Sequence, residues 1–329
     1  MKKVAIIGGG ISGLTCAKFL DPSIFETTIF DKSRSVGGRV STRRYEDYHF
    51  DHGAQYLEET NSPFKHELKR WLDAEVIAPW EAKLGTLEGS RFVNTFKDKL
   101  TYVGVPKMSA IPNHLRDQLD HVNFKFNVKI DELFKKFNEW YLVDQGEDII
   151  GPFDFLVIAI PSHQASVLLS DFPYLQEILN EVEFGPRWAI MIGLTYRLNI
   201  DYDAIFIKNS PIRWMARNNS KPGRPNAESW VVHATKEWSQ KNIERGQDWI
   251  TAQLFGEFLN ITGFESYETK YKQVHLWRYG IVDNPLNQNF ILDNNRNIAL
   301  CGDYCVGNNI EAAFISGENL AERLNSLRI

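Results

Sequence analysis

The first forty residues carry the clearest pattern of apolar and polar stretches in the chain. Residues 4–7 form a short apolar run, typical of a buried parallel strand, and residues 14–20 place apolar side chains at helical spacing. A second predicted strand, 27–30, ends on Asp31. With the glycine-rich turn 8–13 after the first strand, the order is strand, turn, helix, strand and acid, which is the fingerprint of a dinucleotide-binding fold.

Each part of this fingerprint has a physical role. Gly8 permits the tight turn, Gly10 lets a pyrophosphate approach the backbone, and Gly13 lets the helix pack closely on the strand. The amides at the start of the helix face the phosphate anion. Asp31 is then placed to accept hydrogen bonds from ribose hydroxyls.

A second glycine pair follows this acid. Gly37 and Gly38 allow another close approach to the backbone, and Arg39 can neutralise a pyrophosphate. This continuation resembles that of FAD enzymes of the amine-oxidase and glutathione-reductase-like superfamily. It favours a flavin over a nicotinamide cofactor alone; the alternative for Arg39 is a solvated surface cation.

The rest of the chain predicts an α/β (α+β) fold, a Rossmann-like FAD-binding domain with an interleaved, mixed-sheet substrate domain, because no linker is long enough to separate two independent domains. We expect the FAD-binding domain at 1–60, 108–165 and 290–329, and the substrate domain at 61–107 and 166–289. The predicted helices are 62–80, 111–119, 164–181, a short one from Thr235, 249–259 and 310–324. The predicted strands are 87–107 with turns at Gly89 and Lys97-Asp98, 124–130, 140–143, 155–160, 188–196, 213–219, 229–234, 271–279 and 298–301.

Composition narrows the function. The net charge of −5 argues against a nucleic-acid partner, and no apolar stretch approaches the ~20 residues of a membrane span. The apolar start of the sequence is part of the first predicted strand, so we expect no secretory signal. The three cysteines are few and odd in number, so we also expect reduced thiols and a cytoplasmic protein. The eight histidines are scattered, and we expect no metal site.

Two later stretches are further candidates for contact with the cofactor. Residues 53–56, Gly-Ala-Gln-Tyr, would run along a flavin, although an edge strand is the equal alternative. Gly302 and Asp303 end a buried strand, and after the loop 304–309 a helix begins at Ile310. Asp303 can hold ribityl or pyrophosphate groups, and the amides of that helix can face the pyrimidine end of a flavin.

At this point the chain resembles the renalase family of the FAD-dependent amine-oxidase-like superfamily over nearly its whole length. Besides the glycine motifs, the resemblance is carried by substrate-side motifs at 102–106, 108–109, 188–189, 221–224, 230–235, 238–239 and 277–279. It implies a fold like that of p-hydroxybenzoate hydroxylase and FAD held without a covalent bond. The cofactor-binding residues that we predict are Gly8, Gly10, Ile11, Ser12, Gly13, Asp31, Lys32, Gly38, Arg39, Gly53, Ala54, Gln55, Tyr56, Val128, Pro161, Gly302, Asp303, Ile310 and Glu311.

The resemblance implies that the enzyme oxidises the 2- and 6-dihydro isomers of NAD(P)H to NAD(P)+, with O2 reduced to H2O2. Hydride transfer to a flavin needs orientation and the exclusion of water, not a nucleophile or a metal. Three alternatives stay open: a flavin amine oxidase, an FAD-dependent NAD(P)H dehydrogenase with another acceptor, and a flavin-binding protein without turnover. Candidates to line an aromatic substrate pocket, each also a candidate for ordinary core, are Tyr56, Trp188, Trp214, Trp230, His233, Trp277 and Tyr279.

Overall fold

A computed structural model of the protein describes residues 1–95, 99–264 and 268–327. The chain folds into two compact units, and each is assembled from separate stretches of sequence. Unit 1 consists of Met1–Gly38, Pro112–Phe184 and Val282–Ile329, and unit 2 of Arg39–Ile111 and Gly185–Ile281.

Unit 1 is built around a six-stranded sheet in the order β10-β2-β1-β14-β21-β20. The first five strands run parallel, and β20 pairs with β21 in the antiparallel direction. At its centre, residues 4–7 of β1 and all of β14 are apolar and buried, as expected when both faces of a parallel sheet are covered. The bounds of the strands are β1 (Lys2–Ile7), β2 (Phe25–Asp31), β10 (Asn123–Phe126), β14 (Phe155–Ile158), β20 (Ile291–Asp293) and β21 (Ile298–Leu300).

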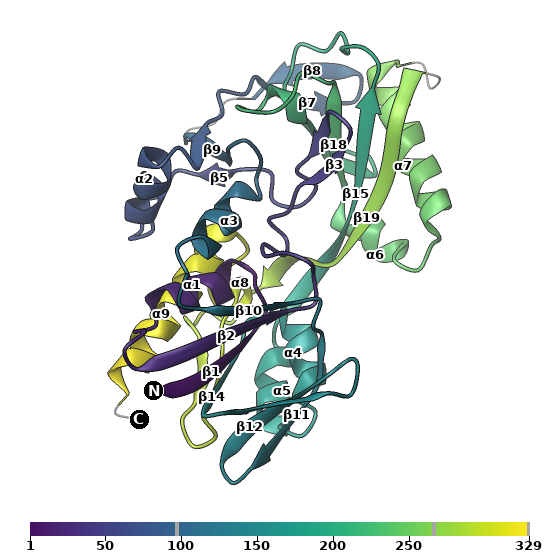
Figure 1. Ribbon diagram of the computed structural model, residues 1–329. Coiled ribbons are helices and arrows are strands. Elements are labelled where there is room, and N and C mark those ends of the chain that lie inside the picture. The colour runs from purple at the N-terminus through teal and green to yellow at the C-terminus, as the bar shows by residue number, and fades with distance from the viewer. Residues whose placement is uncertain (96–98, 265–267, 328–329) are drawn as a thin grey trace. The chain divides into compact units, whose positions relative to one another are not determined.

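The two faces of this sheet are covered differently. Helices α1 (Ile11–Phe19) and α9 (Ile310–Ser326) lie side by side on one face (Figure 1). They approach so closely that a Cβ atom on Gly317 would lie 2.3 Å from the Ser12 carbonyl oxygen. Ala5 and Ile7 point to the other face and pack into a core with the second layer, which consists of β11 (Ile130–Lys136), β12 (Glu139–Asp144), β13 (Ile149–Phe153), α4 (Ser162–Leu168) and α5 (Pro173–Asn180).

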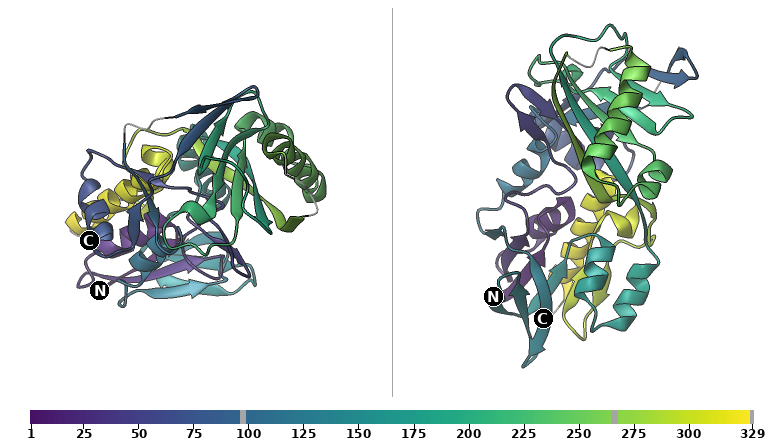
Figure 2. Two further views of the ribbon diagram at one scale, coloured as in Figure 1. Left: turned by 90° about the horizontal axis from the view of Figure 1, so that it is seen from above. Right: turned by 90° about the vertical axis from the view of Figure 1, so that its right-hand side faces the viewer.

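Unit 2 contains a seven-stranded sheet in the order β19-β15-β18-β17-β16-β7-β8. Its described pairs are antiparallel except for β7 with β16. Helix α7 (Gln247–Thr262) lies along one face (Figure 2, right) and buries Leu254 and Phe258 against it. The strands are β7 (Leu84–Glu88), β8 (Arg91–Asn94), β15 (Glu183–Leu194), β16 (Ala204–Ile207), β17 (Ile212–Arg217), β18 (Ser229–Ala234) and β19 (Thr269–Asn284).

Smaller elements complete the chain. The β3–β4 hairpin packs through Phe50 on Met191 and Val231 of the large sheet of unit 2. Helix α6 begins after Thr235, whose hydroxyl oxygen accepts a hydrogen bond from the Trp238 amide at 3.1 Å, as the sequence predicts. The remaining bounds are β3 (Arg43–Tyr45), β4 (Tyr48–Phe50), β5 (Leu57–Glu58), β6 (Ile77–Pro79), β9 (Thr101–Gly104), α2 (Lys65–Asp73), α3 (Ala110–Arg116), α6 (Lys236–Lys241) and α8 (Asp303–Val306).

Several predicted elements are wrong in extent. The helix predicted at 62–80 is only α2, and strand β6 follows it. The helix predicted at 164–181 is divided into α4 and α5, since Pro173 starts a new helix. The strand predicted at 124–130 breaks at Asn127, which has a φ of 58°, and the predicted loop 304–309 contains α8. The turn predicted at Lys97-Asp98 lies outside the described residues.

The units also divide the chain at positions other than the predicted domain boundaries. Residues 39–60, predicted as part of the FAD-binding domain, lie in unit 2 because Phe50 and Asp51 are buried there. Residues 166–184, predicted as substrate domain, lie in unit 1, where Leu169 and Leu175 join the core beneath the parallel sheet. Residues 282–289, also predicted as substrate domain, lie in unit 1 as well, where Val282 joins the same core.

Candidate functional site

The predicted nucleotide-binding loops of unit 1 lie together at one edge of the parallel sheet. Ile7 is in register with Phe30 and with Ile158, and Ile158 is in register with Leu300. The segments that follow these four residues therefore begin in one row, at the carboxyl ends of neighbouring parallel strands. This is where open α/β sheets bind their ligands.

The glycine turn after β1 has the geometry that a bound phosphate requires. Gly8 has a φ of 113°, and a Cβ atom on it would lie 2.5 Å from the Ala159 carbonyl oxygen. A Cβ atom on Gly13 would lie 2.0 Å from the carbonyl oxygen of Gly8, so only glycine lets α1 start this close to the strand. A Cβ atom on Gly10 would meet no protein atom within 4 Å. No side chain caps α1, so the approach to the amides at its start, including those of Ile11 and Ser12, is not blocked by a capping group.

The acid after β2 holds this turn in place. One carboxylate oxygen of Asp31 accepts a hydrogen bond from the Gly9 amide at 2.8 Å, and the other accepts one from the Ser33 amide at 2.7 Å. The carbonyl oxygen of Asp31 accepts from the Val128 amide at 3.0 Å. These bonds bring Asp31 and Val128, both predicted cofactor-binding residues, to the glycine turn. The predicted residue Lys32, next to Asp31, is exposed.

The second glycine pair lies against the first. The Gly37 amide donates to the Gly9 carbonyl oxygen at 2.9 Å, and a Cβ atom on Gly38 would lie 4.0 Å from the α-carbon of Gly10. Two glycine segments thus face the same small region of unit 1. The residues present fit the pyrophosphate part of a dinucleotide, whose oxygens take backbone amides as donors.

The C-terminal segment lies at the same edge of the sheet. The Gly302 amide donates to the Ser316 hydroxyl oxygen at 3.0 Å, and Asp303 is buried at the start of α8. Pro161 follows β14 as the residue before α4. At the start of α9 the side chain of Asn309 already accepts a hydrogen bond from the Ala312 amide at 2.8 Å, so the site predicted at Ile310 and Glu311 includes a helix cap that the sequence analysis missed.

In unit 2 the predicted segment 53–56 follows a buried charge cluster that the sequence analysis also missed. The Asp51 carboxylate receives Lys221 Nζ at 3.2 Å and Arg224 Nη2 at 2.6 Å. The side chains of Asp51, Lys221 and Arg224 are all 0% exposed. The second carboxylate oxygen accepts from the Thr42 hydroxyl at 2.6 Å and from the Met108 amide at 3.0 Å. Burial would raise the pKa of Asp51, but Lys221 and Arg224 hold that pKa well below its usual value.

Gln55 connects this cluster to the segment. Its amide nitrogen donates to the carbonyl oxygens of Asp51 and, at 3.2 Å, of Gly53, and its amide oxygen lies 3.4 Å from Lys221 Nζ. Because an ammonium group can only donate, the amide oxygen must face Lys221. The predicted cofactor ligand Gln55 is therefore also an internal brace of its own segment.

The backbone of this segment is held from both sides. The Ala54 amide donates to the Arg39 carbonyl oxygen at 3.0 Å, and a Cβ atom on Gly53 would lie 2.0 Å from that oxygen. The His52 carbonyl oxygen accepts from Trp277 Nε1 at 2.8 Å and lies 3.1 Å from His233 Nε2. The segment is irregular rather than an edge strand, and buried polar contacts fix its course.

Three histidines gather near this segment, and all are neutral at pH 7. Burial lowers the pKa of His52 to about 4, that of His275 to about 4 and that of His233 to about 3. The His52 ring contacts the His275 and Trp277 rings at centroid distances of 5.0 and 5.1 Å. These imidazoles therefore add polar but uncharged surface to the site.

The seven predicted pocket residues separate onto different sides of the large sheet. Trp188 and Trp230 point toward α7 and belong to the hydrophobic core, with Trp230 at 6.1 Å from Phe258 between ring centroids. Both are enclosed by that core, with 3% and 0% of their surfaces exposed, so the structure does not place them with the other pocket candidates.

The other candidates share the opposite side, which we call the aromatic face. Trp214 is in register with His233, and alternation along β19 places Trp277 and Tyr279 on the same side. Tyr56 packs on Trp214 at 5.9 Å and near Trp80 at 6.3 Å between ring centroids. The structure thus brings Trp214, His233 and Trp277 into contact with residues 52–56, which include the candidate Tyr56, whereas for Tyr279 it fixes only the side of the sheet.

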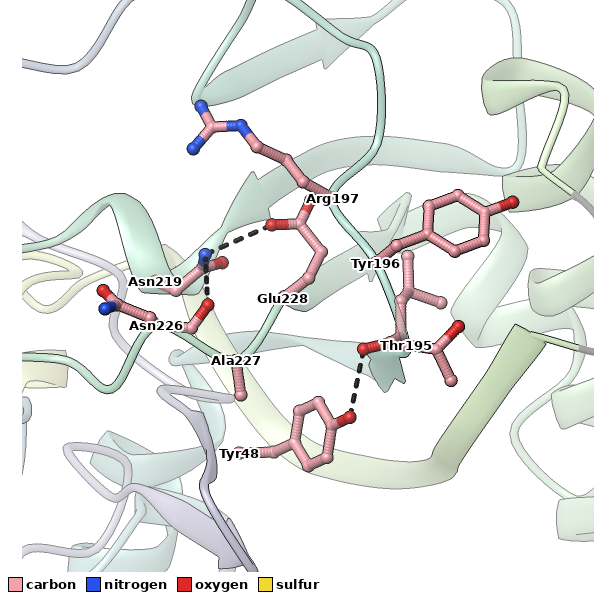
Figure 3. A pocket seen from close by; sticks show the side chains of 9 residues that line it. Tyr48, Thr195, Tyr196, Arg197, Asn219, Asn226, Ala227 and Glu228 are labelled. Carbon is pink, nitrogen blue, oxygen red and sulfur yellow. Dashed lines mark hydrogen bonds between the residues drawn. The ribbon is translucent and has the colours of Figure 1, made fainter.

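A separate surface pocket of unit 2, of about 290 Å³, contains none of the predicted site residues (Figure 3). Its acidic residue, Glu228, makes hydrogen bonds that stabilise the fold. One carboxylate oxygen accepts from Arg217 Nε at 3.0 Å and from Trp230 Nε1 at 2.9 Å, and the other accepts from Asn219 at 3.1 Å. We therefore assign no chemistry to this pocket.

Metal ligands and membrane-spanning helices would also bear on function. Within 1–95, 99–264 and 268–327, His, Cys, Asp and Glu side chains form no group of three that could hold a metal ion. In the same ranges no helix has both the length and the apolar character needed to cross a membrane.

The sequence and the fold are both similar to those of known proteins. Residues 6–74 match the family described as an NAD(P)-binding Rossmann-like domain. The structure is similar to that of a putative protoporphyrinogen oxidase from Exiguobacterium sp. 255-15, with a TM-score of 0.78 at 11% identity over 98% of both chains. It is also similar to putrescine oxidase, with a TM-score of 0.72 at 11% identity over 99% of both chains.

Curated relatives match over shorter stretches. An L-amino-acid oxidase from Sistrurus catenatus edwardsii is 39% identical over 69 residues, which is 21% of this chain and 12% of that protein. Flavin-containing monooxygenase 5 from Mus musculus is 22% identical over 262 residues, 68% of this chain and 43% of that protein. The chain thus spans less than half the length of these relatives.

These comparisons confirm the predicted fold class, a mixed α/β fold with a Rossmann-like domain, as in FAD-dependent oxidoreductases. The relatives that match in sequence, an L-amino-acid oxidase and a flavin-containing monooxygenase, are consistent with the predicted FAD cofactor. The resemblance to renalases, by contrast, is carried by the sequence motifs alone.

Proposed function

We propose that this protein is an FAD-dependent oxidoreductase that oxidises the 2- and 6-dihydro isomers of NAD(P)H to NAD(P)+. Bound FAD would supply the hydride acceptor and, through its reoxidation by O2, the overall reaction NAD(P)H + H+ + O2 → NAD(P)+ + H2O2, in which one hydrogen of the peroxide comes from the dihydropyridine ring and the other from solvent. The chain's own residues then have to bind and orient the substrate and keep water away from it.

In unit 1 the two glycine turns and Asp31 would hold the pyrophosphate and the adenosine ribose. Gly302 and Asp303 would hold the ribityl chain, and FAD would be bound without a covalent bond. In unit 2 the aromatic face would receive the flat nicotinamide ring, with Tyr56 and Trp214 against it. The neutral histidines near that face could hydrogen-bond a carboxamide without adding charge.

One observation favours a dihydronicotinamide over an amine. The buried cluster behind the 53–56 segment contains two cations and one carboxylate, and so has a net charge of +1. A positive charge buried near a substrate repels an ammonium group, whereas it tolerates a neutral ring that carries phosphates elsewhere. The alternative of a flavin amine oxidase is compatible with the fold, but this charge disfavours an amine in its ammonium form, so the amine would have to bind deprotonated.

We expect the isomers to reduce the bound flavin about 100-fold faster than ordinary NAD(P)H or simple amines. The physical reason is that the aromatic face would set one particular ring carbon opposite the hydride acceptor, and a misplacement of about 1 Å can cost ~100-fold in rate. Anaerobic stopped-flow reduction with matched concentrations of each isomer, NADH, NADPH and a set of amines measures this. Comparable reduction by ordinary NAD(P)H would instead favour the dehydrogenase, and reduction by amines alone would favour the amine oxidase.

Two tryptophans of the same sheet, Trp214 on β17 and Trp188 on β15, provide a matched control for this experiment. Trp214→Phe alters the aromatic face and should slow reduction about tenfold, since the ring would be held less well. Trp188→Phe lies on the opposite side of the sheet, against α7, and should leave the rate in the folded protein unchanged. Equal effects of the two substitutions would argue against the aromatic face as the substrate site.

Replacing Arg39 by Ala should weaken FAD binding by about 1.5–3 kcal/mol, the usual contribution of a charge-assisted hydrogen bond to phosphate. Titration of the apoprotein with FAD, followed by flavin fluorescence, measures the change. Arg34→Ala is the control, because Arg34 is an exposed arginine of the same loop with no predicted role. If Arg39→Ala binds FAD as tightly as the parent protein, Arg39 is a solvated surface cation.

A further inference from the structure

The buried cluster of unit 2 contains more positive charge than its partners neutralise. Among the described residues, Asp51 is the one acid that pairs with Lys221 or Arg224. Its two short hydrogen bonds come from Arg224 Nη2 and the Thr42 hydroxyl, at 2.6 Å each. Lys221 makes only longer contacts, at 3.2 Å to Asp51 and 3.4 Å to Gln55. The charge in excess is therefore on the lysine.

Lys221 is placed to act on its surroundings through other residues. Its side chain is 0% exposed, so it touches no ligand directly. Its ammonium group faces the Gln55 amide oxygen and lies 5.4 Å from the centre of the Trp80 ring, which in turn neighbours Tyr56. Both residues connect it to the segment 53–56.

A buried cation without a full counter-charge is costly unless something negative lies nearby. Arg224, Thr42 and the Met108 amide already give Asp51 hydrogen-bond partners without Lys221, so the lysine is not needed to satisfy that carboxylate. We propose that Lys221 is a positioning residue that orients the Gln55 amide and stabilises negative charge on the flavin ring system bound along the 53–56 segment. This inference rests on the proposed FAD cofactor, but not on the identity of the substrate.

Sulfite tests the inference without any substrate, because it adds reversibly to the oxidised flavin ring and brings one negative charge with it. Removal of a nearby unit charge in a protein interior changes such an equilibrium about tenfold or more. Lys221→Met should therefore raise the sulfite dissociation constant about tenfold or more, measured by bleaching of the flavin absorbance. Lys221→Arg, which keeps the charge, should restore most of the affinity.

Lys208→Met is the matched control. It removes the same charge from unit 2, but at an exposed ion pair with Glu88, and should leave sulfite binding unchanged. If Lys221→Met does not fold, Lys221→Gln replaces it, since the glutamine amide can still donate to Asp51, and the same loss is expected. An unchanged sulfite dissociation constant in a folded, FAD-loaded Lys221 variant overturns the inference.

The two proposals fail in different ways. If Lys221→Met raises the sulfite dissociation constant as expected but the dihydronicotinamide isomers do not reduce the flavin, the proposed substrate is wrong and the inference about Lys221 stands. If the isomers reduce the flavin but the Lys221 substitutions leave the sulfite dissociation constant unchanged, the substrate proposal stands and the inference about Lys221 is overturned. A protein that takes up no FAD would overturn both.

Discussion

Replacing Asp51 by Asn is expected to destabilise the folded protein by about 3–5 kcal/mol, the usual cost of breaking a buried ion pair by removing one partner. The substitution leaves Lys221 and Arg224 buried without a counter-charge. It also replaces an acceptor of hydrogen bonds from Thr42 and the Met108 amide by an amide group. Because most domains are stable by only about 5–15 kcal/mol, a loss of this size is visible in urea or thermal unfolding.

The matched substitution is Asp201→Asn. Asp201 also pairs with a lysine, Lys83, but its side chain is 86% exposed. Exposed pairs contribute at most about 1 kcal/mol, so this variant should unfold close to the parent protein. If Asp51→Asn unfolds at the same urea concentration as Asp201→Asn, the three buried charges do not stabilise unit 2 in the way that their distances suggest.

The pH dependence of this contribution has a definite sign. The pKa of Asp51 in the folded protein is well below that of an unfolded aspartate, about 3.9, because two cations outweigh the effect of burial. The stabilisation is therefore fully present above the unfolded pKa and is lost as the pH falls through the folded one. The difference in unfolding free energy between Asp51→Asn and the parent should accordingly be constant from pH 6 to pH 7 and shrink in acid.

The nucleotide-binding end of unit 1 could be predicted from sequence because its signals are local. Strand, glycine turn, helix and acid lie within thirty residues, and each residue type is required by the backbone at its own position. Gly8 has a positive φ, and Gly13 packs on a carbonyl oxygen. A local requirement of this kind leaves a mark in the sequence that needs no knowledge of the rest of the fold.

The aromatic candidates could be predicted only as a set. Alternation along β18 already separates Trp230 from His233, because residues three apart on a strand point to opposite sides. It does not tell which side α7 will cover. On β17 the register also shifts between Ile212 and Trp214, so counting along that strand would misplace Trp214. The division between core and site is a property of the packed sheet.

The charge cluster left no recognisable mark in the sequence. Asp51 is separated from Lys221 by 170 positions, and Lys221 to Arg224 form a Lys-Pro-Gly-Arg stretch that indicates a solvated turn. Cations in such turns are rarely buried. Only the structure, in which Arg224 also donates to the carbonyl oxygens of Gly104 and Pro222, shows that this turn is folded inward.

Gly10→Ala is expected to weaken FAD binding about 100-fold while leaving the apoprotein folded. The new methyl group would meet no protein atom within 4 Å, and Gly10 has an ordinary φ of −77°, so neither packing nor backbone opposes the change. The methyl group would, however, occupy the space through which a pyrophosphate reaches the amides at the start of α1. Loss of one or two charge-assisted hydrogen bonds costs roughly 1.5–3 kcal/mol each. Fluorescence titration of the apoprotein with FAD measures the affinity, and the melting temperature of the apoprotein shows whether its fold is as stable as that of the parent protein.

Two other glycines separate this effect from a general effect of added methyl groups. Gly13→Ala drives a Cβ atom to 2.0 Å from the Gly8 carbonyl oxygen, so the helix has to move, and we expect a loss of about 1–3 kcal/mol in the apoprotein as well as weaker FAD binding. Gly256→Ala lies within α7 with no atom within 4 Å, and should raise stability by up to about 1 kcal/mol without changing FAD affinity. The assignment of Gly10 fails if its alanine variant binds FAD as the Gly256 variant does. It also fails if Gly10→Ala loses FAD only because the apoprotein melts early, as expected for Gly13→Ala, since the methyl group would then act on the fold and not on the path of the phosphate.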